Sequence, residues 1–323
     1  MIEPQPAFDE ATAAFRRVVE NVRRVIAGND DAIEMAVICL FADGNLLLEG
    51  VPGVGKTTLA RALAVSIGGE FSRVQATPDL LPSDLTGISV YDQHKGEFRF
   101  VPGPVFANVV LVDEINRTTP RTQSALLEPM EERQVTIEGV THVLPEPYLV
   151  IATENPVEQH GTYPLPEGQL DRFALAVAVG YPDEDGSTAL VRRQLERHPL
   201  RDLQAVLSPA EVLASQRTVR ETFVDEGVLR YAVDLVTASR RAPGVALGAS
   251  PRASVWLVRA AQARAVADGR DFVLPDDVKA LAVAALAHRL VPVQARGAGA
   301  SAADVVRGLV AEVPVPLHVA RKG

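Results

Sequence analysis

The sequence predicts an α/β fold, in which a mainly parallel five-stranded sheet is followed by a smaller all-α region. Three observations support this prediction. Short apolar runs alternate with helical patterns, a glycine-rich loop joins one such run to a helix, and strand signals end near residue 181. We therefore expect an α/β core over residues 1–182 and a helical domain over residues 183–323. The five expected strands are Leu46–Glu49, Glu70–Ala76, Val109–Val112, Tyr148–Thr153 and Ala174–Val179.

Helical spacing of apolar residues predicts the first two helices. Residues 8–26 form one amphipathic pattern that ends before Gly28, and residues 30–42 form the next. Thr119 as N-cap and Pro120 at the first helical position begin a later helix, which should kink at Pro129. Cap signals also begin the helices of the second region, at Ser208-Pro209, Asp225, Ser250-Pro251 and Leu274-Pro275.

Two segments alternate as β-hairpins do. Residues 88–91 and 97–101 flank a polar stretch at 92–96, which predicts a hairpin with a five-residue turn. Residues 134–137 and 141–144 flank residues 138–140, and they predict a second hairpin.

The stretch Gly50–Thr58 has the most specific chemistry in the chain. It matches the pattern G-x-x-x-x-G-K-[ST] between an expected strand and an expected helix, which is the context of a phosphate-binding P-loop. Lys56 is expected to reach the β- and γ-phosphates of a nucleotide, and Thr57 to bind Mg²⁺ through its hydroxyl. The predicted nucleotide-binding residues are Gly50, Val51, Pro52, Gly53, Val54, Gly55, Lys56, Thr57 and Thr58.

Polar residues follow two other expected strands. Asp113 and Glu114 close the strand Val109–Val112, and Asn155 follows the strand that ends at Thr153. A P-loop enzyme needs acids at this edge of the sheet, so we expect Asp113 to bind Mg²⁺ and Glu114 to deprotonate the attacking water. The neutral amide of Asn155 suits a hydrogen bond to the γ-phosphate and to that water.

Two arginines are candidates for stabilising charge on the transferred phosphoryl group. Arg172 lies in the run Gln169-Leu-Asp-Arg-Phe173, and Arg252 follows the helix-opening pair Ser250-Pro251. A permanently charged, forked guanidinium suits this task, although an isolated arginine more often forms a surface salt bridge.

Composition narrows the classes of function. The chain has 323 residues, 47% of them hydrophobic, and a net charge of -9, which argues against a broad nucleic-acid-binding face. Its single cysteine, Cys39, lies in an apolar run and is expected in the core. No apolar run approaches the ~20 residues of a membrane span, and the N-terminus lacks a secretory pattern, so we expect a soluble, cytoplasmic protein.

With these residues identified, the sequence resembles the AAA+ ATPases, and among them the MoxR family, which is related to the ATPase subunits of magnesium chelatase. The resemblance covers nearly the whole chain. It rests on five core motifs and one in the helical region: Gly50–Thr57 (Walker A), Leu111–Arg117 (Walker B), Gln123–Glu128 with Met130–Thr136, Ala152–Pro156, Leu170–Phe173, and Ser250–Arg252.

The resemblance implies roles for the candidate residues. Asn155 corresponds to sensor 1, Arg172 to an arginine finger donated to a neighbouring subunit, and Arg252 to sensor 2 in an α-helical lid. The hairpins at about 88–101 and 134–144 correspond to the helix-2 insert and the hairpin before sensor 1, which contact the substrate.

The resemblance also implies an assembly and a biological role. It suggests Mg²⁺-dependent ATP hydrolysis by a homo-oligomeric ring, most often a hexamer, that remodels a client protein or helps insert a metal or cofactor. A separate protein with a von Willebrand factor A domain is the expected partner, and the client is not identified by the sequence.

Two other classes remain as alternatives. A DNA-acting AAA+ motor or transcriptional activator would share the core, but the acidic composition and the hairpins poor in basic residues disfavour it. A GTP-binding switch would need an N-K-x-D segment to recognise guanine, and the sequence has none.

Overall fold

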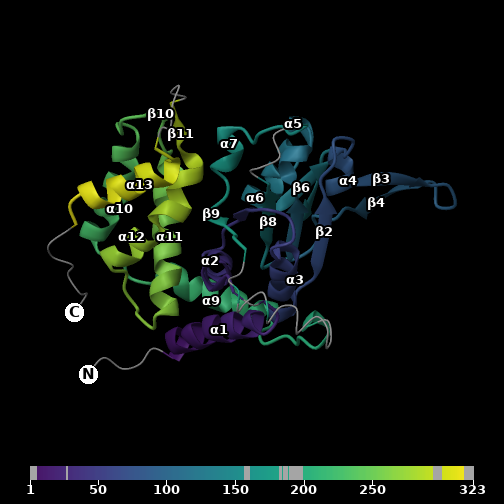
Figure 1. Ribbon diagram of the computed structural model, residues 1–323. Helices are drawn as coiled ribbons and strands as arrows, with labels where there is room; N and C mark the ends of the chain where they lie inside the picture. Colours follow the sequence, from purple (N-terminus) through teal and green to yellow (C-terminus); the bar gives the residue numbers. More distant parts are fainter. Residues whose placement is uncertain are drawn as a thin grey trace.

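The computed structural model describes residues 6–26, 28–155, 161–181, 184, 188, 199–293 and 300–315. A central sheet with helices packed against it forms one side of the molecule, and a group of helices from the second half of the chain forms the other (Figure 1). The predicted α/β fold with a helical lid region is confirmed.

The central sheet has five strands in the order β2-β5-β8-β1-β9, and every pairing is parallel. All five predicted strands are present, with no end shifted by more than one residue. Because the strands are parallel, their carboxyl ends meet at one edge of the sheet and their amino ends at the other. The strands are β1 (Leu46–Glu49), β2 (Phe71–Gln75), β5 (Val109–Asp113), β8 (Leu149–Glu154) and β9 (Leu175–Ala178).

The sheet is covered on both faces, which explains its continuous apolar strands. Leu46 and Leu48 of β1 face the cluster that contains α1 (Pro6–Arg23), α2 (Asp30–Phe41) and α3 (Lys56–Ser66), whereas Leu47 faces the opposite cluster. Cys39 lies fully buried in the first cluster, as predicted, and burial raises the pKa of its thiol.

The predicted helix after Thr119 is two helices, so the expectation of one kinked helix was wrong. They are α5 (Pro120–Ser124) and α6 (Leu127–Glu132), and Pro129 lies near the start of the second. Proline cannot donate a backbone hydrogen bond, and its ring clashes with the carbonyl four residues earlier. The break at residues 125–126 satisfies both constraints. Short helices also flank this region: α4 (Pro82–Thr86), η1 (Ile115–Arg117) and α7 (Glu167–Leu170).

Both predicted hairpins are present, but their turns are one residue shorter than expected. In the first hairpin, β3 (Gly87–Asp92) and β4 (Glu97–Pro102), Asp92 pairs with Glu97. In the second hairpin, β6 (Gln134–Ile137) and β7 (Val140–Val143), Ile137 pairs with Val140. Its two turn residues both have positive φ, as a tight hairpin turn requires, and so the strands pair closer to the turn than alternation alone indicated.

The second half of the chain is mainly helical. Each predicted cap begins a helix, and Ser208, Asp225 and Ser250 accept backbone hydrogen bonds there. The prediction of an all-α region was not fully correct, because β10 (Val245–Leu247) and β11 (Val291–Pro292) form a small antiparallel ribbon. These strands are too short, and one contains proline, to give a sequence signal. The helical elements are η2 (Pro199–Arg201), α9 (Pro209–Glu221), α10 (Glu226–Ser239), α11 (Pro251–Ala267), α12 (Pro275–Leu286), η3 (Ala287–Arg289) and α13 (Ala302–Glu312).

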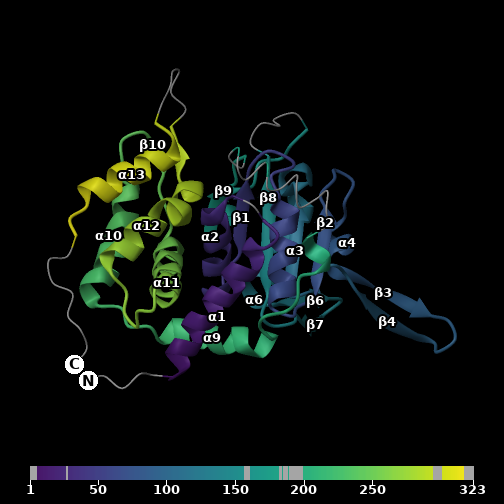
Figure 2. The ribbon, with the colours of Figure 1, turned by 60° about the horizontal axis from the view of Figure 1, so that its bottom comes forward.

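The two halves are packed together. Helices α1 and α9 lie side by side across one end of the molecule (Figure 2), and α1 also contacts α11. One hydrophobic cluster runs from α1, α2 and α3 into the lid helices. Among the described residues, no helix is both long and apolar enough to span a membrane.

Candidate functional site

The P-loop has the geometry that its glycines predict. It runs from the end of β1 into α3, and Gly53 and Gly55 adopt φ values of 87° and 96°. A Cβ atom at either position would meet nothing within 4 Å, so the loop needs glycine there for backbone conformation rather than for space. Gly50 differs, because an added Cβ would lie 2.4 Å from the carbonyl oxygen of Val179.

A cleft of about 360 Å³ lies over the P-loop. Lys56 is buried there, and its Nζ donates hydrogen bonds to the carbonyl oxygens of Gly50 and Glu154. Burial lowers the pKa of Lys56, and the nearby carboxylates of Asp113 and Glu114 oppose that shift. Pro52, Gly53, Gly55, Lys56, Thr57 and Thr58 line the cleft, whereas Gly50, Val51 and Val54 complete the loop without lining it.

The predicted acids lie in the same cleft. Thr153 donates a hydrogen bond to Asp113 Oδ1 at 2.7 Å, and its Oγ1 accepts the backbone N–H of Glu114 at 2.9 Å. This threonine fixes both residues from the neighbouring strand β8. Glu114 has φ 59° and ψ 48°, a left-handed conformation that a non-glycine residue rarely adopts. The structure therefore holds Glu114 in a constrained backbone geometry at the edge of the cleft.

Asn155 completes the set at this edge. It follows β8, lies in the cleft and is 5% exposed. Its strand neighbours the strand of Asp113, because β8 pairs with β5.

Two residues of β2 also line the cleft, and the sequence analysis did not identify them. Arg73 forms an ion pair with Asp113 at 2.6 Å, and Gln75 donates a hydrogen bond to Glu114 at 3.2 Å. Gln75 is the register partner of Asp113. The available signal was the polar alternation at the end of this strand, beside a strand that ends in two acids.

The composition of the cleft fits a magnesium nucleotide. Its lining combines one lysine and exposed loop N–H groups, which suit phosphates, with a hydroxyl and a carboxylate, which suit Mg²⁺. No group of three or more acidic, histidine or cysteine side chains that could hold a metal is found in the described part of the chain.

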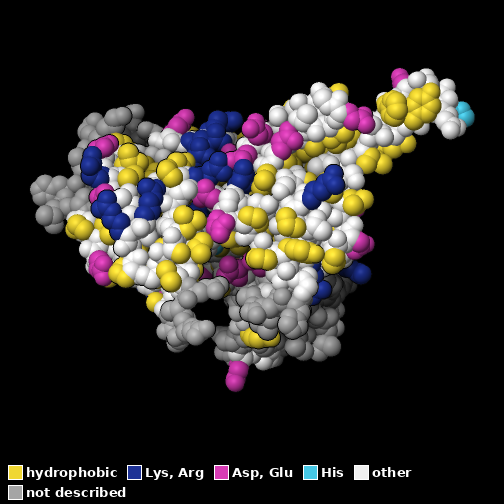
Figure 3. Space-filling view, turned by 90° about the horizontal axis from the view of Figure 1, so that it is seen from above, with side chains coloured by type: hydrophobic (Ala, Val, Ile, Leu, Met, Phe, Trp, Pro, Cys, Tyr) yellow, Lys and Arg dark blue, Asp and Glu magenta, His cyan; other side chains and the backbone are white. Residues whose placement is uncertain are grey.

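Arg172 and Arg252 bind the same carboxylate, which lies outside this cleft. Arg172 Nε donates to Glu131 Oε2 at 2.8 Å, and Arg252 forms an ion pair with the other oxygen of the same carboxylate. Both line a second cavity, of about 420 Å³, with Arg133 and Arg259. In the view from above, Lys and Arg side chains gather where the helical half meets the sheet, with acidic side chains beside them (Figure 3).

The arginine pair lies at the amino-terminal edge of the sheet. Arg172 precedes β9, and the cavity also includes Asp43, which precedes β1. The P-loop follows the carboxyl end of β1, so the four residues of this strand, about 13 Å at ~3.3 Å per residue, separate the two sites. None of the residues that the structure describes lines both cavities. The predicted site residues therefore form two groups at opposite edges of the sheet.

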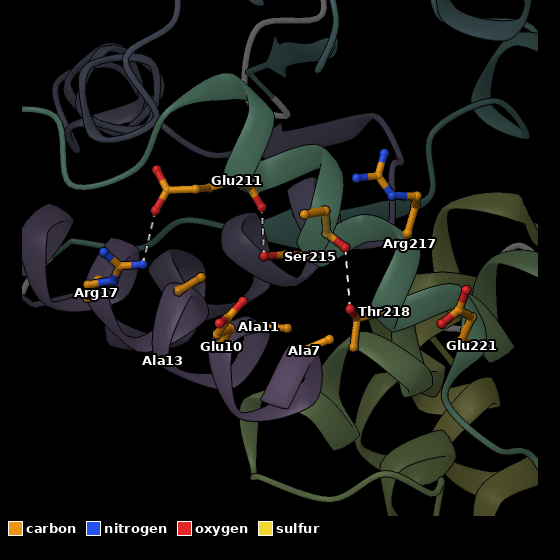
Figure 4. Close-up of a pocket in the computed structure, with 12 residues that line it drawn as sticks. Ala7, Glu10, Ala11, Ala13, Arg17, Glu211, Ser215, Arg217, Thr218 and Glu221 are labelled. Carbon is orange, nitrogen blue, oxygen red and sulfur yellow. Dashed lines mark hydrogen bonds and ion pairs between the residues drawn. The ribbon is translucent and has the colours of Figure 1, made fainter. Parts of the chain in front are cut away.

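Another cavity, of about 420 Å³, lies between α1 and α9 (Figure 4). Several alanines line it, and the carboxylate of Glu211 is engaged by Ser208 and Arg17. These contacts, the hydrogen bonds from Ser208 first, lower the pKa of Glu211. With Arg17 paired to Glu211 and several alanines between the two helices, this groove has the features of helix packing.

The first hairpin projects from the body (Figure 2), and hydrophobic side chains lie along it (Figure 3). Phe98 is 69% exposed and packs against Tyr91, which is 52% exposed. At the base, Phe100 stacks on His142 of the second hairpin, with ring centroids 3.9 Å apart. This contact joins the two hairpins.

The fold and the P-loop cleft define a P-loop nucleotide hydrolase with a helical lid. Residues 45–175 match the family model for ATPases associated with various cellular activities (AAA), and residues 237–309 match the AAA lid domain. The chain thus belongs to the AAA ATPase family, and ATP hydrolysis is the activity that this membership implies.

Similar proteins indicate which kind of AAA ATPase the chain is. The chain is 42% identical to the chaperone MoxR1 of Mycobacterium tuberculosis, covering 90% of this chain and 80% of that protein. It is 34% identical to protein MoxR of Methylorubrum extorquens, covering 95% and 96%. A crystal structure of a Cytophaga hutchinsonii protein assigned as an ATPase aligns with a TM-score of 0.89 at 38% identity, covering 97% and 98%. The chain is a MoxR-type AAA ATPase.

Proposed function

We propose that this chain hydrolyses Mg²⁺-ATP as a homo-oligomeric ring, with a hexamer as the expected size. Each ATP site lies between two subunits of that ring. The P-loop cleft of one subunit binds the nucleotide, and Arg172 and Arg252 of its neighbour complete the site. Residues 1–182 act as the nucleotide-binding core, and residues 183–323 as the lid.

The residues of the cleft have distinct roles in this proposal. The P-loop residues 50–58 bind the phosphates, with Lys56 supplying a positive charge and Thr57 and Asp113 holding Mg²⁺. When bound, Mg²⁺ neutralises charge on the phosphates. Glu114 accepts a proton from the attacking water, and Asn155 orients that water.

The observation that supports assembly most strongly is the separation of the two groups. Arg172 and Arg252 share Glu131 at one edge of the sheet, and the nucleotide cleft lies at the other. Neither arginine is placed to reach a phosphate in its own cleft. A head-to-tail interface, which repeats to close a ring, would bring this edge of one subunit to the cleft of the next.

The exposed hairpin supports a protein as client. Its apolar side chains, including Ile88, Val90 and Phe98, form a surface suited to an apolar protein segment. The relative MoxR1 is named a chaperone. We therefore propose that hydrolysis remodels a client protein or assists metal or cofactor insertion, with a separate von Willebrand factor A protein as partner.

The alternative of a DNA-acting motor has weaker support. The described hairpin strands and turns carry few basic residues, and their exposed side chains are largely apolar, whereas backbone recognition of DNA requires clustered Lys and Arg. Binding to a DNA duplex at low salt, lost on raising the salt, would favour this alternative.

The proposed shared site can be tested by mixing two inactive variants. Lys56→Ala subunits lack a working cleft, and Arg172→Ala subunits lack a working finger. In random rings about a quarter of the interfaces join an intact cleft to an intact arginine, so ATPase activity should return to roughly that share of the normal rate. If no mixing ratio restores activity, Arg172 does not act on the neighbouring subunit.

A further inference from the structure

Asp171 joins the loop that carries Arg172 to the helix that carries Arg252. Ser250 Oγ donates to its carboxylate, 2.8 and 2.9 Å from the two oxygens, and Arg289 Nε donates to Oδ1 at 2.9 Å. Ser250 is also the N-cap of α11, where its Oγ accepts the backbone N–H of Arg252 at 3.1 Å. One carboxylate therefore connects the backbones of the two arginines across both halves of the chain.

Arg289 reinforces this connection from η3, which directly follows α12. Its guanidinium is buried, and it donates to the backbone carbonyls of Asp171, Phe173 and Ala174, which make up the loop around Arg172. Burial lowers the pKa of Arg289 to about 10, against the opposing effect of Asp171, so the side chain remains charged at neutral pH. The loop before β9 is thus held to the lid at several points by one residue.

We propose that Asp171 is a positioning residue which, with Ser250 and Arg289, fixes Arg172 and Arg252 relative to each other so that both act on one phosphate of the neighbouring subunit. The inference rests on the proposed function, and it explains why two arginines from distant segments meet on Glu131. Asp171 acts on the two arginines through the backbone, since Ser250 bonds both its carboxylate and the N–H of Arg252. The lid and the Arg172 loop then move as one body.

Positioning of this kind has a measurable effect on catalysis. A misplacement of about 1 Å at a reacting group can reduce a rate by roughly 10²-fold. Loss of Asp171 should therefore lower kcat while leaving the KM for ATP nearly unchanged, because the cleft that binds ATP lies at the other edge of the sheet.

The test places Asp171→Asn separately in each partner of the complementing mixture. In the donor, which is the Lys56→Ala subunit, it should lower the recovered ATPase activity about tenfold or more. In the acceptor, which is the Arg172→Ala subunit, the recovered activity should stay within about twofold of the parent mixture. Asp43→Asn in the donor is a matched control, since Asp43 also bonds a lid arginine, Arg220, at this edge of the sheet.

Variants of Ser250 separate positioning from helix capping. Ser250→Asp keeps an N-cap, because aspartate caps helices as well as serine, but it faces Asp171 with a like charge. Ser250→Asp should therefore lower the recovered ATPase activity when it is placed in the donor, but not when it is placed in the acceptor. Ser250→Thr keeps both the cap and the hydroxyl donor, so it should restore most of the activity. Melting temperature and ring assembly are measured for every variant.

Each other outcome contradicts the proposal. Full activity with Asp171→Asn or Ser250→Asp in the donor shows that the connection is dispensable. Equal losses in donor and acceptor show a role in folding or assembly, and a loss in the acceptor alone shows an effect within one subunit. If the parent mixture itself stays inactive, the shared-site function fails, and this inference fails with it.

Discussion

The two edges of the sheet differ in how their functional residues come together. At the carboxyl edge, the predicted residues of the cleft lie in the P-loop, at the end of a strand or directly after one. At the amino edge, Arg172 and Arg252 come from distant segments and meet on Glu131, which lies in a third. The first arrangement follows from local sequence, whereas the second exists only after the two halves have packed.

The edges also differ in charge. In the cleft, Asp113 and Glu114 are balanced by Lys56 and Arg73, whereas the other cavity holds four arginines and two acids. Phosphates bound in the cleft would add negative charge, and the arginine-rich edge would compensate it. This complementarity agrees with an interface that joins unlike edges of identical subunits.

Glu114→Gln should have the largest effect, because it removes the proposed general base from the cleft at the carboxyl edge. Loss of a general base typically costs 10²- to 10⁴-fold, so kcat should fall by about 10³ while ATP binding persists. Steady-state ATPase assays and nucleotide-binding titrations measure the two effects. Glu70→Gln, an exposed carboxylate beside β2, is the matched control. Normal turnover by the Glu114 variant would remove it as the base.

Arg172→Ala should disable the other edge with an effect of similar size. We expect kcat to fall by about 10³-fold, the lower end of the range for arginine fingers, with the KM for ATP nearly unchanged. Arg220→Ala is the control, because Arg220 is a paired, exposed arginine that bonds Asp43 near the same edge. A large rise in KM with kcat retained would instead mean that Arg172 acts in ATP binding.

Dilution tests whether both edges of the sheet are needed, because only assembled subunits bring the arginine edge of one subunit to the cleft of another. Specific ATPase activity should fall by about tenfold or more as rings dissociate, approaching the rate of Arg172→Ala. Activity and light scattering are measured over the same concentration series. Constant specific activity from a protein shown to be monomeric would mean that one subunit is sufficient.

The smallest predicted effect concerns two carboxylates at the end of adjacent strands, Glu49 and Glu154. Burial, and then the neighbouring charge of Glu49, raise the pKa of Glu154 to about 7. Because the folded state holds this proton more tightly than the unfolded state, stability should fall as pH rises from about 4.5 to about 7. Glu154→Gln should remove that loss. Its effect on the free energy of unfolding, relative to the unsubstituted protein, should be about 1–3 kcal/mol more favourable at pH 8 than at pH 5. Chemical denaturation of both proteins at the two pH values measures this difference. If the variant keeps the same pH dependence of stability, the prediction is contradicted.

Much of the fold was predictable because its signals are local. The buried strands, the P-loop and the helix caps each occupy a few consecutive residues, and Asp113, Glu114 and Asn155 follow strand ends. The break before Pro129 and the β10–β11 ribbon were missed, since short elements depend on tertiary packing rather than on period.

The placement of the arginines could not be predicted for a similar reason. Sequence position identified Arg172 and Arg252 as cations, but it did not show that they share a carboxylate or that Asp171 links their backbones. Arg73 and Gln75 were missed because their role appears only when β2 pairs with β5.

The central claim is that both arginines serve a neighbouring subunit, and one paired measurement tests it most directly. An Arg172→Ala/Arg252→Ala acceptor is mixed with a Lys56→Ala donor, and an Arg172→Ala acceptor with a Lys56→Ala/Arg252→Ala donor. The account predicts recovered ATPase activity in the first mixture and almost none in the second. Recovery in the second mixture but not in the first would show that Arg252 acts within its own subunit, and would contradict the account.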